Sequence, residues 1–308
     1  MRISTPHVII TLVLIVAVAG AGFAQRGPIP TPLIKEGVTE KITDHVYVIP
    51  DGSAPLIPNV SIIVGSRATF VVDTGIGTRN AEVILREVAK VSKNSELYLA
   101  TTHVHPEHDL GAHGFPANTK MVRSNDQVKE IAADGLQTAQ RFAGFSPDVA
   151  EMLKGAEFRK ADITFDKEQV VDLGGVRIRA MAMGFNHTAG DTAFFVEGDG
   201  VLISGDVVMG VLPGVGPNSR IATWLASMDR FEKLQPKRIV PSHGPMGDVS
   251  FVTNNRAFLM TVRNRAAALK QEGKSADETV KLLQDELGGK YDRNRMVGAI
   301  RVAYNEAS

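Results

Sequence analysis

The stretch Thr102-His103-Val104-His105-Pro106-Glu107-His108-Asp109 places three histidines within six residues. A β-rich run at residues 97–101 precedes it, so these side chains are predicted to lie on a loop that leaves a sheet edge and enters a helix. Side chains two positions apart in an extended segment point the same way, so His103 and His105 can share one metal ion. Glu107 and His108 follow a proline that turns the chain, and they can hold a second ion.

Three more candidate ligands stand at predicted strand ends. His187 lies in Gly184-Phe185-Asn186-His187-Thr188-Ala189-Gly190-Asp191, Asp206 follows Leu202-Ile203-Ser204-Gly205, and His243 lies in Val240-Pro241-Ser242-His243-Gly244-Pro245. Binding residues gather at such strand-to-loop junctions. The chain has no cysteine, which limits a metal site to nitrogen and oxygen ligands. Zinc accepts imidazole and carboxylate ligands, and iron or manganese also take mixed ligands of this kind.

The order of five motifs resembles that of the metallo-β-lactamase superfamily. They are Val71-Val72-Asp73-Thr74-Gly75, the H-x-H-x-[D/E]-H run, the later G-x-x-H-T-x-G-D, Ser204-Gly205-Asp206 and Ser242-His243-Gly244, and they span roughly residues 40–245. The resemblance implies an α/β (α+β) fold, a four-layer αββα sandwich with metals at one edge of its two sheets.

The resemblance also implies a ligand set. His103, His105 and His187 would bind the first metal, Glu107, His108 and His243 the second, and Asp206 would bridge both. Asp73 would be a buried residue behind the ligands. Asp191 is interpreted either as a partner that orients a ligand histidine or as a turn residue beside Gly190.

One position departs from the family pattern, which usually has Asp where this chain has Glu107. Because Glu is one methylene longer, the second ion is expected to be bound less tightly, displaced or absent. The adjacent Asp109 could compensate, or it could simply favour the dipole of the helix that begins here.

The resemblance implies a metal-dependent hydrolase that uses a metal-bound hydroxide, with zinc as the expected cofactor, one or two ions. Glu107 or Asp206 would orient the attacking water and pass its proton on. Family β-lactamases carry Cys or Ser at the position of Asp206, whereas relatives acting on thioesters, lactones and phosphodiesters carry Asp. We therefore expect cleavage of an ester, lactone, thioester or cyclic amide, with β-lactam hydrolysis open as a side activity.

Two apolar loops, residues 53–58 and 209–217, are candidates to frame the site and would favour a small, partly apolar substrate; ordinary surface loops are the alternative. Asn218 or Arg220 could contact a substrate carbonyl or carboxylate, or could instead cap the following helix.

Two competing functions remain open. The first is a non-hydrolytic metalloprotein accessory to a periplasmic redox or sulfur-oxidation pathway. The diiron electron-transfer relatives carry Glu at the position of His105, which argues against it. The second is a binding module with a degenerate site, indicated only by Glu107.

The composition and the N-terminal segment indicate which partners and which localisation to expect. The 308 residues carry 34 basic and 34 acidic side chains, so nucleic-acid binding is not favoured and a small-molecule substrate is expected. Arg2, the apolar run at residues 8–21 and Gly22-Phe23-Ala24 are typical of a signal peptide, which predicts a periplasmic or secreted protein. A retained anchor is the alternative, although the apolar run is shorter than the about 20 residues that span a bilayer. The sequence does not indicate an oligomeric state.

The predicted organisation is a signal peptide (1–24), a Pro-rich linker (25–40), a catalytic domain (41–250) and a C-terminal helical extension (251–308). Helices are expected from Thr78 as a cap, over 125–155 with breaks near Gly144 and Pro147, over 221–231, and in the tail, where Ser275 and Glu278 form a capping box before a stop at Gly288. Strands are expected at 46–49, 59–64, 69–72, 97–101, 169–173, 176–181, 192–196, 201–204 and 238–240.

Overall fold

The computed structural model describes residues 29–308. The predicted signal peptide and the first part of the predicted linker lie outside the described residues, so cleavage and export stay predictions. Among the helices of residues 29–308, none combines the length and hydrophobicity that crossing a membrane requires.

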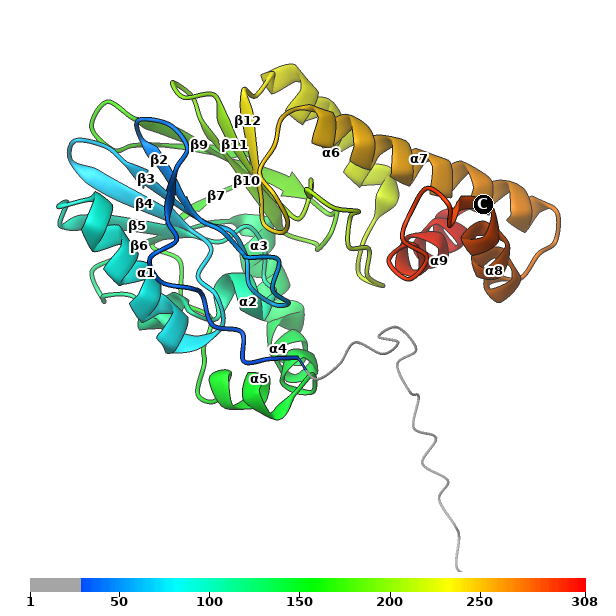
Figure 1. The fold of residues 1–308 in the computed structure, drawn as a ribbon, viewed down its shortest axis with the longest axis horizontal. Coiled ribbons are helices and arrows are strands. Elements are labelled where there is room, and N and C mark those ends of the chain that lie inside the picture. The colour runs from blue at the N-terminus through cyan, green and yellow to red at the C-terminus, as the bar shows by residue number, and fades with distance from the viewer. Residues whose placement is uncertain (1–28) are drawn as a thin grey trace, which may run out of the picture.

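Two β-sheets form the centre of the protein (Figure 1). The first sheet has the order β1-β2-β3-β4-β5-β6-β7, antiparallel from β1 to β4 and parallel from β4 to β7. Its strands are β1 Glu40–Lys41, β2 Val46–Ile49, β3 Val60–Val64, β4 Ala68–Val72, β5 Glu96–Ala100, β6 Lys120–Ser124 and β7 Ile163–Phe165.

The second sheet has the order β12-β11-β10-β9-β8, and only its β11–β12 pair is parallel. Its strands are β8 Glu168–Asp172, β9 Arg177–Gly184, β10 Asp191–Val196, β11 Val201–Gly205 and β12 Arg238–Pro241. The predicted strand positions are confirmed, although β9 runs past its predicted end to Gly184. The sequence prediction missed β1, β6 and β7.

Three hydrophobic clusters correspond to the three contacts between four layers. One lies between the sheets and joins side chains such as Phe70 of β4 to Phe194 of β10. A second packs the outer face of the first sheet against Ile84 and its neighbours in α1 (Gly77–Val91). The third packs the outer face of the second sheet against the C-terminal helices. Both faces of each sheet are therefore covered, which confirms the expected αββα sandwich.

Helices cover the two outer faces unequally. The helix α1 lies outside the first sheet, while α6 (Ile221–Leu234) and α7 (Ser250–Gln271) lie outside the second (Figure 1). The sequence had suggested Thr78 as the cap of α1, and this prediction is wrong. The N-cap is Ile76, whose side chain makes no capping hydrogen bond. The positive φ of Gly77 lets the chain turn directly into the helix.

Between β6 and β7 the chain is helical with interruptions, as predicted. The segments are α3 (Asn125–Glu130), a π-helical turn (Ile131–Gly135), α4 (Leu136–Ala143) and α5 (Pro147–Met152). A short helix, α2 (Pro106–Asp109), carries part of the histidine cluster. π-Helical turns often occur near functional sites, and this one leads into a helix beside that cluster.

The C-terminal extension contains α7, α8 (Ala276–Leu287) and α9 (Met296–Glu306). The predicted capping box of Ser275 and Glu278 is present, and Gly288 is the C-cap of α8. The extension shares its hydrophobic cluster with Met181, Ala193 and Leu202 of the second sheet. It therefore packs as part of the sandwich, and the predicted boundary at residue 250 marks a change in secondary structure.

The extension also fastens the segment between β11 and α6, residues 206–220, called here the 206–220 loop. The Asn255 side chain of α7 bonds both the N–H and the carbonyl of Met209, at 2.9 and 3.2 Å. The Glu306 carboxylate of α9 accepts the N–H groups of Ile221 and Ala222 at the start of α6. Because this loop begins with Asp206, the extension helps to position one of the candidate ligands.

Close packing at Gly298 offers a test of this arrangement. A methyl group there would come within 1.9 Å of the Val215 carbonyl oxygen. Gly→Ala in a helix normally stabilises it, by about 1 kcal/mol. We expect Gly298→Ala instead to lower the free energy of unfolding by about 1–3 kcal/mol, the usual cost of overpacking, as measured by urea denaturation. Gly289→Ala is the control, because nothing lies within 4 Å of its added methyl; equal effects of the two variants would contradict the packing.

Candidate metal centre

Seven side chains from four loops meet at one edge of the two sheets. His103 and His105 lie on the segment between β5 and α2, and Glu107 and His108 lie in α2. The other three follow strands of the second sheet: His187 after β9, Asp206 after β11 and His243 after β12. These seven side chains form three overlapping groups of neighbouring ligand atoms: His103, His105 and His187; His103, His108 and Asp206; and Glu107, His108 and His243.

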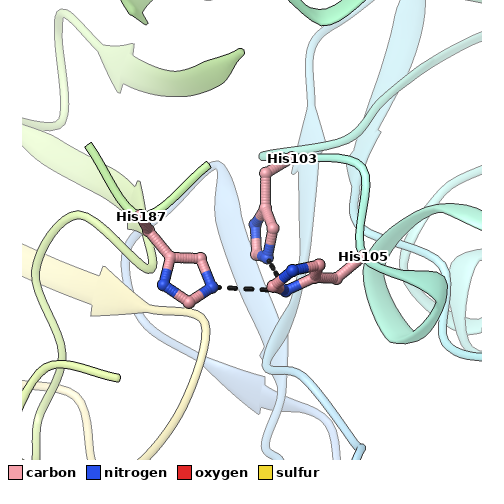
Figure 2. A group of neighbouring side chains, drawn as sticks. All are labelled: His103, His105 and His187. Carbon is pink, nitrogen blue, oxygen red and sulfur yellow. Dashed lines mark hydrogen bonds between the residues drawn. The ribbon is translucent and has the colours of Figure 1, made fainter. Parts of the chain in front are cut away.

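The first group has the spacing of a tetrahedral metal site. His105 Nδ1 lies 3.0 Å from His103 Nε2 and 3.2 Å from His187 Nε2, with all three rings pointing toward one another (Figure 2). Four-coordinate zinc, with zinc–nitrogen bonds of about 2.0–2.1 Å, places pairs of ligand nitrogens about 3.3 Å apart. The three imidazoles thus surround a point where one cation fits.

Glu107, His108 and His243, called here the second ligand group, lie beside the first group. The Nε2 atoms of His108 and His243 are 3.3 Å apart, and Glu107 Oε1 lies 3.8 Å from His108 Nε2. Asp206 faces both groups, since Oδ2 lies 3.3 Å from His187 Nε2 and Oδ1 lies 3.9 Å from His243 Nε2. A carboxylate in this position can bridge two cations.

Two carboxylate oxygens at the centre are buried without a hydrogen-bond partner among the described residues: Glu107 Oε2 and Asp206 Oδ1. An unsatisfied buried acceptor costs about 1–3 kcal/mol, and more when it is charged. Burial raises the pKa of Glu107. Burial acts in the same direction on Asp206, but the imidazoles of His243, His187 and His108 outweigh it and lower the Asp206 pKa. A bound cation would satisfy both orphaned oxygens, so the donor set fits a metal.

The protonation of the first group also suits metal binding. Burial, together with the surrounding imidazoles, holds the pKa of His103 and of His105 well below the usual range. Both rings are therefore neutral at pH 7 and offer nitrogen lone pairs, which is the form that ligates a metal.

The opposite ring nitrogens are held by hydrogen bonds. His187 Nδ1 donates to the Gly214 carbonyl at 2.6 Å, and His108 Nδ1 donates to Asp73 Oδ2 at 2.9 Å. These bonds fix the tautomer and leave Nε2 to face the centre, as is usual for metal-binding histidines. His103 Nδ1 lies 3.1 Å from the hydroxyl of Thr102.

Asp73 ties three loops together behind the ligands. It accepts the Thr102 N–H at 2.7 Å, the Ser242 hydroxyl at 3.1 Å and the His108 ring. Burial alone would lower the pKa of His108, but the Asp73 carboxylate outweighs it and raises that pKa to about 9. The φ of Asp73 is +69°, a strained value for a residue with a side chain, and these bonds hold it there.

Sequence comparison agrees with the geometry. A sequence model of the metallo-β-lactamase superfamily matches residues 54–243, more than half of the chain. The chain belongs to this superfamily. Among curated proteins, no significant match was found.

Solved metallo-β-lactamase-fold structures resemble this chain at low sequence identity. A metallo-β-lactamase from Pontibacter korlensis has a TM-score of 0.58 and 19% identity, covering 71% of this chain and 96% of its own. A metallo-β-lactamase family protein from Thermus thermophilus has a TM-score of 0.63 and 20% identity, covering 86% and 93%. An inverting sec-alkylsulfatase from Pseudomonas sp. has a TM-score of 0.68 and 13% identity, covering 87% of this chain but only 49% of its own. At these identities the similarity shows the fold alone.

Asp191, in the superfamily's G-x-x-H-T-x-G-D motif, holds the loop that carries His187. Its carboxylate accepts the His187 N–H at 2.7 Å and the Thr188 hydroxyl at 2.7 Å. Burial raises the Asp191 pKa to about 7. Asp191 therefore acts on the His187 backbone and on the turn, while the His187 ring is oriented by Gly214.

Asp109 points away from the metal centre of this superfamily member. Its carboxylate forms a two-pronged ion pair with Arg123, with Arg123 Nη2 2.8 Å from Asp109 Oδ1, and it accepts the Thr101 hydroxyl at 2.8 Å. Both partners of the ion pair are almost completely buried. Asp109 therefore does not compensate for Glu107 as a ligand; it anchors α2 to β6.

The side chains of the two residues suggested as substrate contacts bond or stack on other groups of the protein. Asn218 bonds Asp134 at 3.4 Å, which links the 206–220 loop to the π-helical turn. Arg220 is the N-cap residue of α6 but makes no side-chain cap bond, and its guanidinium stacks over Phe185 at 4.7 Å. Neither side chain caps α6.

The two predicted framing loops both attach to the segment that carries His243. Asp51, just before residues 53–58, accepts the Gly244 N–H at 2.8 Å. In the 206–220 loop, the Gly210 N–H donates to the His243 carbonyl at 3.3 Å. Both loops therefore flank the second ligand group.

Sequence reasoning missed three neighbours of the site. The Phe142 ring of α4 lies 5.2 Å from the His105 ring. The charges of Arg141 and Arg295 also act on the cluster, the first on His105 and the second on Asp206. No local signal in the sequence pointed from these residues to the metal centre, because they reach it only through tertiary packing.

The Arg123–Asp109 pair generates a testable prediction. Arg123→Met leaves the Asp109 carboxylate buried and unpaired, so we expect the free energy of unfolding to fall by about 3–5 kcal/mol in urea denaturation. The control is Arg293→Met, which removes an exposed ion pair with Asp285 and should cost less than about 1 kcal/mol. A loss no larger than that of the control would mean that the buried pair does not stabilise the fold.

Proposed function

We propose that this protein is a metal-dependent hydrolase that cleaves an ester, lactone, thioester or cyclic amide, with zinc as its metal. The observation that carries the proposal is the first imidazole group: three ring nitrogens 3.0–3.2 Å from their nearest neighbour, joined through Asp206 to a second group with an orphaned carboxylate oxygen. Buried polar groups normally have a hydrogen-bond partner, and a bound cation would supply the partner that these carboxylate oxygens lack.

The chemistry would be divided between the cation and the chain. A divalent cation held by these residues would supply a water whose pKa is lowered from about 16 to about 7, and hydroxide would then be available at neutral pH. Asp206 and Glu107 are the carboxylates positioned to accept a proton from the attacking water. The water oxygen bonds to the carbonyl carbon as the bond to the leaving group breaks, and the proton passes to that leaving group. Asp73 and Gly214 keep His108 and His187 in the orientation that holds the site.

The substrate proposal rests on Asp206 and on the extent of the structural similarity. This chain has Asp206 where family β-lactamases have Cys or Ser, which favours the broader ester-type hydrolases. The Pontibacter metallo-β-lactamase covers 71% of this chain, whereas the Thermus protein and the sec-alkylsulfatase cover 86% and 87%. A sulfate ester therefore joins the substrate classes to be tested, and β-lactam cleavage remains a side activity in the proposal.

The experiment that tests the proposal is a combined metal and substrate analysis. Purified protein is loaded with zinc, its metal content is measured by mass spectrometry, and hydrolysis is followed on lactone, thioester, carboxylic ester, phosphodiester, sulfate ester and β-lactam panels. We expect one tightly bound zinc ion per chain, a second that is bound less tightly, and turnover of an ester or lactone. Bound iron with visible absorbance and no turnover of any panel would instead support a redox metalloprotein and refute the hydrolase.

His105→Ala tests the ligand assignment. Removing this imidazole breaks the first group, so we expect loss of at least one metal ion per chain together with a fall in hydrolysis of more than about 100-fold. His113→Ala is the matched control, because His113 lies a few residues further along the chain and is exposed. Full metal content and activity in His105→Ala would show that the cation binds elsewhere.

A further inference from the structure

The chain segment that carries His243 is held by the side chain of Asn59. Asn59 lies just before β3 of the first sheet, whereas residues 241–244 lie at the end of β12, an edge strand of the second sheet. Asn59 Nδ2 donates to the carbonyls of Pro241 and Gly244, at 2.8 and 2.9 Å. One side-chain amide therefore joins the two sheets and binds the backbone on both sides of a candidate ligand.

The remaining polar groups of Asn59 strengthen the same contact. Its N–H donates to the Ser242 carbonyl at 2.7 Å, and its Oδ1 accepts the Asp51 N–H at 2.8 Å. The Asp51 carboxylate in turn accepts the Gly244 N–H at 2.8 Å. Asn59 is only 3% exposed, so losing its side chain would leave buried backbone groups unpaired. We call this arrangement on residues 241–244 the Asn59–Asp51 clamp.

The ring of His243 is held less directly than the rings of two other candidate ligands. In His108 and His187, Nδ1 is fixed by a hydrogen bond to another group of the protein. Within residues 29–308, no hydrogen bond involves Nδ1 of His243, and its side chain is 21% exposed. The position of the His243 ring therefore depends mainly on the backbone that the Asn59–Asp51 clamp holds.

Metal binding is sensitive to such a displacement. Nε2 of His243 lies 3.3 Å from Nε2 of His108, and bonds from zinc to its ligands vary by only about 0.2 Å. A small shift of residues 241–244 would therefore take His243 out of reach of a shared ion. The first group, by contrast, contains no residue of this segment. Loosening the Asn59–Asp51 clamp should consequently affect one ion more than the other.

We propose that Asn59 is a positioning residue for the second cation: its amide fixes residues 241–244, so that the second ligand group binds its ion. The inference rests on the proposed function in one respect, that this group holds zinc. Because Glu107 is expected to weaken the second ion, its affinity depends on the placement of His243. Asparagine suits this role, since one short side chain supplies two N–H donors and an acceptor, whereas aspartate has no donor.

A buried asparagine in another part of the fold provides a matched control. Asn80 Nδ2 donates to the carbonyls of Pro32 and Ile76, at 2.8 and 2.9 Å, and its Oδ1 accepts the Ile34 N–H at 2.8 Å. These bonds hold the segment before β1 against α1 and involve no segment that carries a candidate ligand. Asn59→Ala and Asn80→Ala therefore remove the same amide and the same number of side-chain hydrogen bonds.

The test measures the affinity of each zinc ion. Zinc-loaded protein is titrated with a chromophoric chelator, which removes the more weakly bound ion first, and His243→Ala identifies the step that belongs to the second ligand group. For Asn59→Ala we expect the second ion to bind about 10–100-fold more weakly and the first to change less than about twofold. Asn59→Asp, which keeps the shape but loses both donors, should have the same effect. Asn80→Ala should change neither ion.

A second variant tests the Asn59–Asp51 clamp if Asn59→Ala does not fold. Asp51→Ala removes only the acceptor of the Gly244 N–H, so we expect a smaller loss of affinity at the same ion. Unchanged affinity in the clamp variants, equal losses at both ions, or an equal effect of Asn80→Ala would overturn the inference, since each indicates a structural role or none. Wild-type protein that binds a single ion would also overturn it.

Turnover is measured separately, so that failure of the hydrolase proposal can be recognised. If the wild type hydrolyses an ester, Asn59→Ala should lose activity at limiting zinc and recover it in excess zinc, whereas a loss that excess zinc does not restore would contradict the positioning role. If the wild type binds two ions but hydrolyses nothing, the hydrolase proposal fails. The chelator titration then still decides the role of Asn59.

Discussion

The central physical constraint on this structure is the free-energy penalty of burying imidazoles and carboxylates together at one edge of the two sheets. Four loops bring imidazoles and carboxylates so close that ring nitrogens lie 3.0–3.3 Å apart, and two carboxylate oxygens have no partner among the described residues. Such a cluster is unfavourable unless a cation supplies the missing interactions. The fold keeps the cluster together because each candidate ligand follows the end of a buried strand or lies in the short helix after it. The free energy gained by packing the sandwich core offsets the free energy lost by burying these groups.

A layer of polar contacts behind the ligands limits how far the loops can move. Asp73 joins the His103 loop, His108 and Ser242, while Asp191 holds the backbone at His187. On the far side of α2, the ion pair of Arg123 and Asp109 links the helix to β6. Each of these groups is buried and satisfied, so displacing one loop would expose unpaired charges in the others. This coupling preorganises the ligand positions, as the proposed hydrolysis would require.

The C-terminal extension takes part in the same arrangement. Its helices share the hydrophobic cluster of the second sheet. Asn255 and Gly298 contact the 206–220 loop, and Glu306 bonds the start of α6 that follows this loop. That loop provides Asp206 and the Gly214 carbonyl. The extension can therefore influence the metal centre without providing a ligand.

The sequence by itself determined the fold class, most strands and the seven clustered residues, because strand patterns and the His-rich motifs are local signals. It missed β1, β6 and β7, whose short runs carry no distinctive alternation, and it misplaced the cap of α1. Only the tertiary structure decided that Asp109 pairs with Arg123, that Asn218 and Arg220 engage other residues, and that Arg295 acts on Asp206. Those outcomes depend on which distant side chains share a buried volume, and the spacing of residues along a chain does not contain that information.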